Sequence, residues 1–265
     1  MKVSEVMNTE YETIDKDQML SDAIELLRKS KKLSRLIVTE DDEPVGVLTF
    51  RDVADRLGTP TTGRRSSKSL RVSSTMSYPL KTIPPNTSIK EAAQKMIENK
   101  ISSLLVMEKG KLKGLVSKFD IISYYKHRKD VTVASLMTKE PYVITPSERV
   151  ISARKIMMDN DYSTLPVVND ESVPIGIVDD ETLADALASF RDNVPKKYQK
   201  NKLKQFYVGQ VMRKDPPQLE EIAPLQDLIK LLKETHHKAV FIVNDANVIS
   251  GIVSVTDITN AIAKE

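Results

Sequence analysis

GVLTFRD, residues 46–52, decides the fold because heptads of this pattern occur four times in the chain. The other copies are GLVSKFD at 114–120, GIVDDET at 176–182 and GIVSVTD at 251–257. A start of the form Val-x-x-(Val, Thr or Leu)-Met precedes each copy. Its methionine lies 38 or 39 residues before the glycine of the heptad, at Met7, Met76, Met137 and Met212. Repetition at so constant a spacing indicates four copies of one structural unit.

Each unit has the same predicted order of elements. A short extended segment comes first, followed by a stretch with apolar residues at helical spacing, such as SIKEAAQKMIEN at 88–99. Two apolar runs of strand length around a charged turn come next, and a second helix ends the unit. The predicted fold class is therefore α/β, of the α+β kind, with four β-α-β-β-α units. We place the units at residues 1–57, 70–127, 131–190 and 205–265.

The size of one unit predicts that the units pair. A unit of about 60 residues has only a small core of its own. We expect the first unit to pair with the second and the third with the fourth, giving modules at 1–127 and 128–265. The two modules could stack within one chain, or two chains could associate through their helices as a homodimer, and the sequence leaves both open.

Composition bounds the class of protein. The 40 Lys and Arg residues against 37 Asp and Glu give a net charge of +3, which does not indicate a polycation built for nucleic acid. The absence of cysteine excludes disulfides and thiolate metal sites, and three histidines without HExxH spacing predict no metal site. No run of about 18 uncharged apolar residues and no apolar leader occur. We therefore expect a cytoplasmic protein without a membrane helix.

The heptad has two interpretations. A hydroxyl followed three residues later by an acid is a helix-capping pair. The same geometry suits a ligand, because a helix start attracts anions and a carboxylate accepts hydrogen bonds from two ribose hydroxyls. Arg51 and Lys118 add positive charge that suits phosphate. The pairs are Thr49 with Asp52, Ser117 with Asp120, and Ser254 with Asp257.

The third heptad helps to separate these interpretations. Asp179 keeps a good helix cap, but Asp179, Asp180 and Glu181 would repel a phosphate. Thr182 stands where the other copies have aspartate and cannot offer two charged acceptor bonds to a ribose. A motif that only caps helices permits such an exchange in any copy. A ligand motif predicts that three units bind and one does not, and we favour the ligand interpretation.

These residues resemble a known family. The heptads, the apolar runs SRLIV, SSLLV and STLPVV, and the methionine starts resemble the G-h-h-[ST]-x-x-D signature of cystathionine-β-synthase (CBS) domains. The resemblance covers nearly the whole chain. It implies repeats paired into Bateman modules, whose clefts bind adenosine ligands such as AMP, ADP, ATP or S-adenosylmethionine. A chain of four repeats is similar to archaeal stand-alone CBS proteins and to the γ subunit of AMP-activated kinase.

Carried over position by position, the resemblance implies a ligand-binding set. The ribose carboxylates would be Asp52, Asp120 and Asp257, with Thr49, Ser117 and Ser254 as neighbouring hydroxyls. The segment before the first helix would contact base or ribose through Thr13, Ile14, Thr82, Ile83, Pro84, Gln218 and Leu219. The sequence itself adds Arg35, Arg51, Ser102, Ser103, Lys118 and His237 as candidate ligand-binding residues. The alternative interpretations are a solvated side chain for Arg35 and a polar helix end for His237. The second repeat matches best, whereas the first has Asp15 in place of a proline and the fourth has Glu220 and Glu221 nearby.

The resemblance predicts a non-enzymatic regulatory protein. It would sense AMP, ADP or ATP, require no cofactor, and signal occupancy to an unknown regulated protein partner. We find no P-loop and no GxSxG motif, and the repeats leave no room for a catalytic domain. One alternative is a sensor of S-adenosylmethionine or methylthioadenosine. Another is nucleic-acid binding through RRSSKSLR at 64–71 or KKYQKNKLKQFYV at 196–208, which is not expected as the main function because no known nucleic-acid-binding signature appears.

Overall fold

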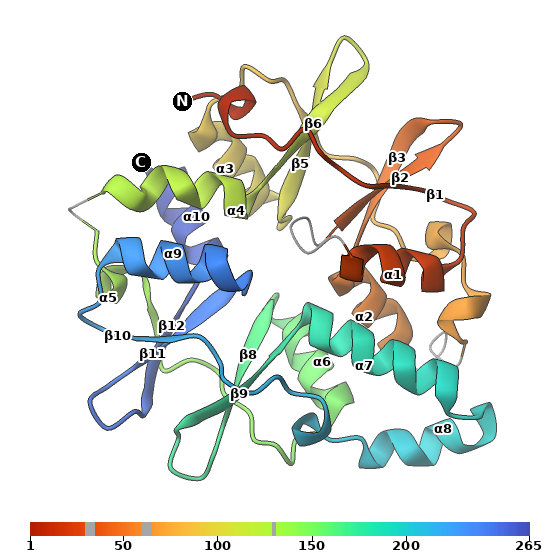
Figure 1. Cartoon of the computed structure of the whole chain (residues 1–265), viewed down its shortest axis with the longest axis vertical. Coiled ribbons are helices and arrows are strands. Elements are labelled where there is room, and N and C mark those ends of the chain that lie inside the picture. Colours follow the sequence, from red (N-terminus) through yellow and green to blue (C-terminus); the bar gives the residue numbers. More distant parts are fainter. Residues whose placement is uncertain (30–34, 60–64, 129–130) are drawn as a thin grey trace. The chain divides into compact units, whose positions relative to one another are not determined.

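The computed structural model describes residues 1–29, 35–59, 65–128 and 131–265, and Figure 1 labels its elements. Ser34 of the first apolar run and two cations of the basic stretches, Arg64 and Lys129, lie outside the described residues. Contacts between Cα atoms divide the chain into two compact units. The first–third unit contains Glu12–Pro79 and Tyr142–Asp215. The second–fourth unit contains Met1–Tyr11, Leu80–Pro141 and Pro216–Glu265.

The first–third unit holds the elements of two repeats, except that the predicted first strand of the third repeat forms only a bridge between Ile144 and Val167. The first repeat forms β1 (Thr13–Asp15), α1 (Leu20–Lys29), β2 (Arg35–Glu40), β3 (Glu43–Thr49) and α2 (Phe50–Gly58). The third forms α6 (Val150–Asp159), β8 (Thr164–Val168), β9 (Pro174–Asp179) and α7 (Asp180–Asn193). The connecting segments add η2 (Ser67–Ser69), η3 (Val72–Ser74), α8 (Lys196–Lys202), η5 (Leu203–Gln205) and η6 (Val208–Gln210). In the first repeat, β2 pairs with β1 in parallel and with β3 antiparallel.

The second–fourth unit repeats this plan. The second repeat forms β4 (Thr82–Ile83), α3 (Ile89–Glu98), β5 (Ser103–Glu108), β6 (Lys111–Ser117), α4 (Lys118–Ile122) and η4 (Ser123–His127). The fourth forms β10 (Gln218–Glu220), α9 (Leu225–Thr235), β11 (Ala239–Val243), β12 (Ile249–Ser254) and α10 (Val255–Lys264). The repeat starts add η1 (Val3–Glu5), α5 (Val133–Leu136) and β7 (Thr138–Lys139). The sheets have the orders β4-β5-β6 and β10-β11-β12-β7.

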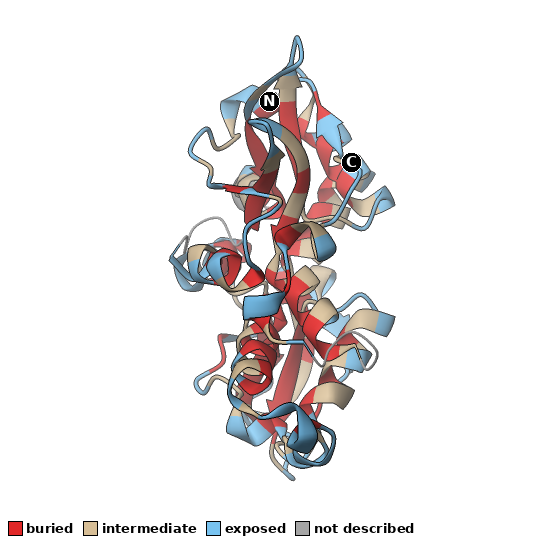
Figure 2. Cartoon of the chain, turned by 90° about the vertical axis from the view of Figure 1, so that its right-hand side faces the viewer, coloured by how far each residue is buried: buried red, intermediate tan, exposed pale blue. Residues whose placement is uncertain are grey.

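Helices join the two repeats inside each unit. Helix α2 packs on α7 in the first–third unit, and α10 packs on α3 and α4 in the second–fourth unit. Apolar residues at helical spacing on α2, such as Val53 and Leu57, share one buried core with Leu183 and Leu187 of α7. Figure 2 shows the buried residues along the strands and on one side of the helices. The predicted α/β fold of four repeats is confirmed, while the pairing of the first with the second repeat stays a prediction.

The start of each repeat packs on the heptad of another repeat. Asn8 bridges to Leu115 of the second repeat, and Ser77 bridges to Val47 of the first. Thr138 of the third repeat pairs with Ile252 of the fourth, and Arg213 of the fourth bridges to Ile177 of the third. In every case the partner is the residue after the heptad glycine. The first and second repeats therefore exchange their starts, and so do the third and fourth.

This exchange explains the glycine of the heptad. A Cβ atom on Gly46 would lie 2.7 Å from the sulfur of Met76, and one on Gly176 would lie 2.7 Å from the sulfur of Met212. A Cβ atom on Gly114 would lie 2.6 Å from the backbone oxygen of Asn8. Distances this short require an atom to move. Glycine is needed here because it lets the exchanged backbone approach the strand closely.

We expect Gly114→Ala to destabilise the protein by about 1–3 kcal/mol, because the added methyl group overpacks a contact with backbone. Chemical denaturation of the full chain measures this change. Gly110→Asn is the matched control, since Gly110 has φ +76° and open space around it, which asparagine tolerates. Equal stability of the Gly114→Ala variant and the wild type would show that the exchanged start does not pack tightly.

Candidate functional site

The three heptads that end in aspartate all cap a helix. Oδ2 of Asp52 accepts hydrogen bonds from the backbone N–H and hydroxyl of Thr49, at 2.8 and 2.6 Å. Asp120 receives the same pair of bonds from Ser117 at 2.7 and 2.6 Å, and Asp257 receives them from Ser254 at 2.7 and 2.6 Å. The capping interpretation is therefore physically sound.

Capping uses only one oxygen of each carboxylate. Among the described residues, no side chain or backbone group donates a hydrogen bond to Oδ1 of Asp120 or of Asp257. An ionised carboxylate has about four lone-pair positions for hydrogen bonds. The second oxygen of these aspartates can accept bonds from a ligand without loss of the cap.

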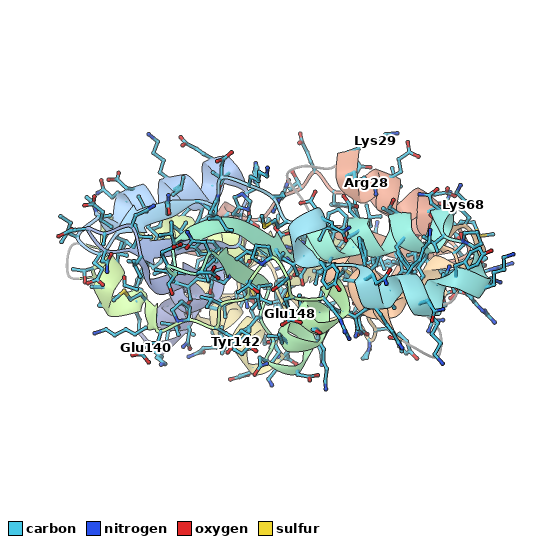
Figure 3. All side chains as sticks on the ribbon, turned by 90° about the horizontal axis from the view of Figure 1, so that it is seen from below. Arg28, Lys29, Lys68, Glu140, Tyr142 and Glu148 are labelled. Atoms are coloured by element: carbon cyan, nitrogen blue, oxygen red, sulfur yellow. The ribbon has the colours of Figure 1, made fainter. Side chains whose placement is uncertain are left out.

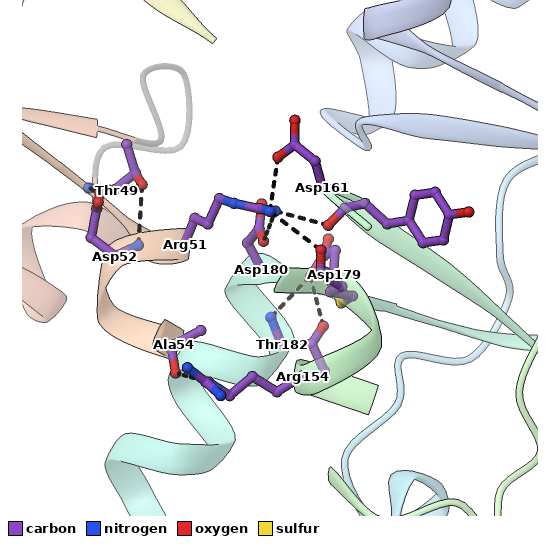
Figure 4. A network of polar contacts seen from close by, with 11 residues as sticks. Thr49, Arg51, Asp52, Ala54, Arg154, Asp161, Asp179, Asp180 and Thr182 are labelled. Carbon is purple, nitrogen blue, oxygen red and sulfur yellow. Dashed lines mark hydrogen bonds and ion pairs between the residues drawn. The ribbon is translucent and has the colours of Figure 1, made fainter. Parts of the chain in front are cut away.

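In the first heptad an exchanged residue reaches this second oxygen. The hydroxyl of Ser77 donates to Oδ1 of Asp52 at 2.6 Å, and Figure 4 shows Asp52 with its Thr49 bond. Burial raises the pKa of Asp52, and the negative charge of Asp180 adds a smaller effect in the same direction. Hydrogen bonds from Ser77 and Thr49 act in the opposite direction. A ligand at this carboxylate would replace or share the Ser77 bond.

The strand register gathers other predicted residues at the heptads. Arg35 is paired with Thr49, Ser103 with Ser117, and Ala239 with Ser254. The N–H of Lys118 donates to the backbone oxygen of Ser102 at 3.1 Å, and His237 lies two residues before β11. Arg35, Ser102, Ser103 and His237 are thus placed at the same strand ends as the heptad hydroxyls.

The segments before the first helices are placed less uniformly. Thr13, Thr82 and Pro84 are exposed. The side chains of Ile14 and Ile83 lie in the two cores, with 2% and 1% of their surface exposed. These isoleucines can therefore meet a ligand only through backbone groups. In the fourth repeat, Gln218 is exposed and Leu219 is half-buried on β10.

The two cations predicted to bind phosphate already make contacts inside their units. Arg51 pairs with Asp161 at 2.9 Å and with Asp180 at 3.4 Å, and Figure 4 shows these bonds. Arg51 also donates to the backbone oxygen of Tyr162 at 2.8 Å. Lys118 is buried, and its Nζ donates to the hydroxyl of Thr256 on α10 at 3.0 Å. Contact of either cation with a phosphate stays a prediction.

In the third heptad the order of acidic and hydroxyl residues is reversed, and arginines of the same unit pair with its acids. Oδ1 of Asp179 accepts hydrogen bonds from the N–H and hydroxyl of Thr182 at 2.9 and 2.8 Å. Here the acidic residue is the N-cap of α7 and the hydroxyl residue follows three positions later, which is the reverse of the other heptads. Arg213 forms an ion pair with Oδ2 of Asp179 and lies 3.6 Å from Glu181. Register places Arg213 where the other heptads meet Ser77, Asn8 or Thr138. The negative charge of this heptad is thus largely neutralised inside the unit.

The cavity beside the third heptad is small. Its volume is about 250 Å³, and Glu181, Thr182, Asp185 and Arg213 lie among its lining residues. Sites for small molecules usually measure about 300–1,000 Å³. Among the described residues, no group of three acidic or histidine side chains is placed to hold a metal ion. No described helix is long and apolar enough to cross a membrane.

Sequence reasoning missed the exchanged residues. Ser77 and Arg213 each contact the acid of a heptad in another repeat, at Asp52 and Asp179. Their shared signal is a position directly after the methionine of a repeat start. This position predicts contact with a heptad acid only once the fold shows that it lies beside the heptad of another repeat.

One solved structure shares this architecture along nearly the whole chain. Protein MJ1225 from Methanocaldococcus jannaschii has the same fold, with a TM-score of 0.83 at 19% identity over 98% of this chain and 99% of that one. CBSX2 from Arabidopsis thaliana, solved in complex with AMP, matches 50% of this chain and 96% of its own at 26% identity, with a TM-score of 0.42.

Sequence comparison adds a curated relative. Inosine-5′-monophosphate dehydrogenase from Korarchaeum cryptofilum is 36% identical over 97 residues, which are 37% of this chain and 20% of that enzyme. The chain therefore spans about a fifth of the length of this relative. The CBS domain profile matches residues 3–59, 72–127, 133–189 and 208–264. With four matches that cover most of its length, the chain belongs to the CBS domain family.

Proposed function

We propose that this protein is a regulatory sensor that binds adenosine ligands at its first, second and fourth heptads. The leading ligands are AMP, ADP and ATP. The observation that carries the proposal is the carboxylate oxygen of Asp120 and of Asp257 that the helix cap leaves unused. A ribose offers two neighbouring hydroxyl donors, and an acidic residue plays this acceptor role in dinucleotide-binding folds.

The proposed response is a change in the population of conformations. A ligand shifts an equilibrium only by the difference in its affinity for the two states. The ribose carboxylates lie at the starts of α2, α4 and α10, and these helices make the junctions between repeats within each unit. A ligand that binds Asp52, Asp120 or Asp257 would therefore favour one arrangement of the helix junctions. A protein partner would recognise that arrangement.

The contacts of Arg51 favour a second class of ligand for the first site. This guanidinium pairs with Asp161 and Asp180, so its charge is not available to a phosphate unless those bonds are exchanged. A ligand that carries ribose and adenine but no phosphate avoids that cost. S-adenosylmethionine and 5′-methylthioadenosine have this chemistry, and we include them as candidate ligands.

Melting of the full chain with a panel of ligands tests the proposal. The panel contains AMP, ADP, ATP, S-adenosylmethionine and 5′-methylthioadenosine, with GMP as the control for the base. A ligand at about 100 times its dissociation constant stabilises the folded state by about 2.7 kcal/mol, which raises the melting temperature measurably. We expect a shift with at least one adenosine ligand and a smaller shift with GMP. No shift with any of the five adenosine ligands would refute the proposal.

Binding at the first site should depend on pH. The ionised carboxylate of Asp52 is the better acceptor for ribose hydroxyls, and burial raises its pKa above the ordinary value. Affinity should be complete above this raised pKa and fall as the pH is lowered through it, earlier than for an ordinary aspartate. Calorimetric titration from pH 7 to pH 4, in a variant with the second and fourth heptads disabled by Asp120→Asn and Asp257→Asn, measures this. Affinity that is constant over this range would exclude Asp52 as the acceptor.

A further inference from the structure

Residues 190–207 lie between the parts of the chain that match the third and fourth CBS domains. They form the end of α7, helix α8 and the turn η5. Gln199 of α8 is buried with 2% of its surface exposed, and its Oε1 accepts a bond from Arg191 at 2.8 Å. Arg191 is buried too and donates to the backbone oxygen of Leu57 at 3.0 Å. One side of α8 is thus anchored to the first–third unit by buried polar bonds.

An aromatic contact fixes the far end of the same segment. The rings of Phe190 and Phe206 stack with their centroids 5.3 Å apart. These residues bracket α8 and η5 in the sequence. The segment is therefore held at both ends and in its middle, as expected for a surface with a fixed shape rather than for a loose linker.

The outer side of this segment carries only positive charge. No Asp or Glu occurs between Asp192 and Asp215. Among the described residues, no acid forms an ion pair with any of its exposed lysines, although the Nζ of Lys197 lies 4.8 Å from the ring centre of Tyr198. The exposed lysines are Lys196, Lys197, Lys200, Lys202 and Lys204.

A second basic stretch is tied to the same place. Asp192, the acid nearest to α8 in the sequence, accepts bonds from the hydroxyl of Ser66 and from the N–H and hydroxyl of Ser67, at 2.6, 2.8 and 2.6 Å. The exposed neighbours Arg65 and Lys68 are thereby held beside the end of α7. Figure 1 shows α8 following α7 in the chain, and Figure 3 labels Lys68.

We call these seven cations the cationic surface; they are Arg65, Lys68, Lys196, Lys197, Lys200, Lys202 and Lys204. They carry +7 in a chain of net charge +3, so the remainder of the chain carries −4. A charge separation of this size attracts a polyanion to one place and repels it elsewhere. Like charges placed together repel one another, and the buried bonds of α8 hold its lysines in place despite this repulsion. A bound polyanion would relieve the repulsion and stabilise the surface.

We propose that the cationic surface binds the phosphate backbone of single-stranded nucleic acid. The exposed cations of α8 and η5 are all lysines, whose ammonium groups bind phosphates as point charges. Tyr198 and Tyr207 are 49% and 38% exposed and offer rings on which bases can stack. No nucleic-acid-binding signature occurs in the chain, but helix α8 holds its lysines in a fixed place through the buried bonds of Gln199 and Arg191. This binding is separate from the proposed adenosine sites.

Fluorescence anisotropy with a labelled 20-nucleotide single strand, as RNA and as DNA, tests this on the full chain. The test variant is Lys196→Gln/Lys197→Gln/Lys200→Gln. The control is Lys100→Gln/Lys109→Gln/Lys111→Gln, which removes the same charge from exposed lysines elsewhere. Each phosphate contact contributes about 0.7 to the slope of log affinity against log salt concentration. We expect the slope to fall by about 2 in the test variant and to stay unchanged in the control.

Three results would overturn the proposal. They are no saturable binding of either strand at low salt, equal loss of affinity in the two variants, and equally strong competition by a polyglutamate peptide of the same charge. The melting shift with adenosine ligands should be the same in both variants and the wild type. Failure of the adenosine sites would therefore be seen separately from failure of the cationic surface.

Discussion

Inverting the second heptad by Ser117→Asp/Asp120→Thr should weaken adenosine-ligand binding at that site on the order of 100-fold while leaving the helix cap in place. The variant copies the pattern of the third heptad, where Asp179 caps Thr182 with bonds of 2.9 and 2.8 Å. The ribose loses two hydrogen bonds to a charged acceptor. Each contributes about 1.5 kcal/mol or more, so the expected loss is about 3 kcal/mol.

Calorimetric titration with the ligand found in the melting panel measures this loss. The matched control is Ser88→Asp/Glu91→Thr, which inverts the capping box of α3, where both Ser88 bonds to Glu91 are 3.0 Å long. This control measures the effect of an inverted cap on stability at a position outside the heptads. Unchanged affinity in the Ser117→Asp/Asp120→Thr variant would show that Asp120 serves the helix alone.

The opposite exchange should create a site. We expect Asp179→Ser/Thr182→Asp/Arg213→Ser to raise the number of ligands bound per chain by one. The variant restores the hydroxyl-to-acid order of the other heptads and removes the arginine that pairs with Asp179. Removing both partners of this pair avoids leaving one charge buried without its partner. Asp180 keeps its contact with Arg51 in the variant.

The single change Arg213→Ser is the control for this prediction. It leaves Asp179, which is 6% exposed, without its arginine, so it should destabilise the protein and add no ligand site. Calorimetry gives the number of bound ligands, and circular dichroism confirms that each variant is folded. A folded triple variant that binds no more ligand than the wild type would show that the heptad and Arg213 do not decide whether a repeat binds.

The repeats and their elements could be predicted from sequence because they depend on local patterns. The spacing of 38 or 39 residues and the apolar periodicity of segments such as Ile89–Glu98 are visible in the chain itself. The capping bonds between Ser88 and Glu91 likewise join residues only three positions apart. The packing of α2 on α7 was not foreseen, because it joins the first repeat to the third.

The parts of the candidate site that sequence reasoning missed all depend on long-range contacts. From its neighbours in the sequence, Arg51 is predicted to bind phosphate. Its acidic partners Asp161 and Asp180 lie more than 100 residues away along the chain. Ser77 and Arg213 belong to the starts of repeats and reach the heptads of other repeats only after those starts are exchanged. A single sequence does not reveal which strand end such a segment will meet.

The number of adenosine ligands bound per folded chain at saturation, measured by calorimetric titration, is the most direct test of the sensor proposal. We predict saturable binding of at least one of AMP, ADP, ATP, S-adenosylmethionine and 5′-methylthioadenosine. The number should not exceed three, and it should reach zero when the first, second and fourth heptads are all inverted. Absence of saturable binding in the wild type, or binding that survives inversion of all three heptads, would contradict the account.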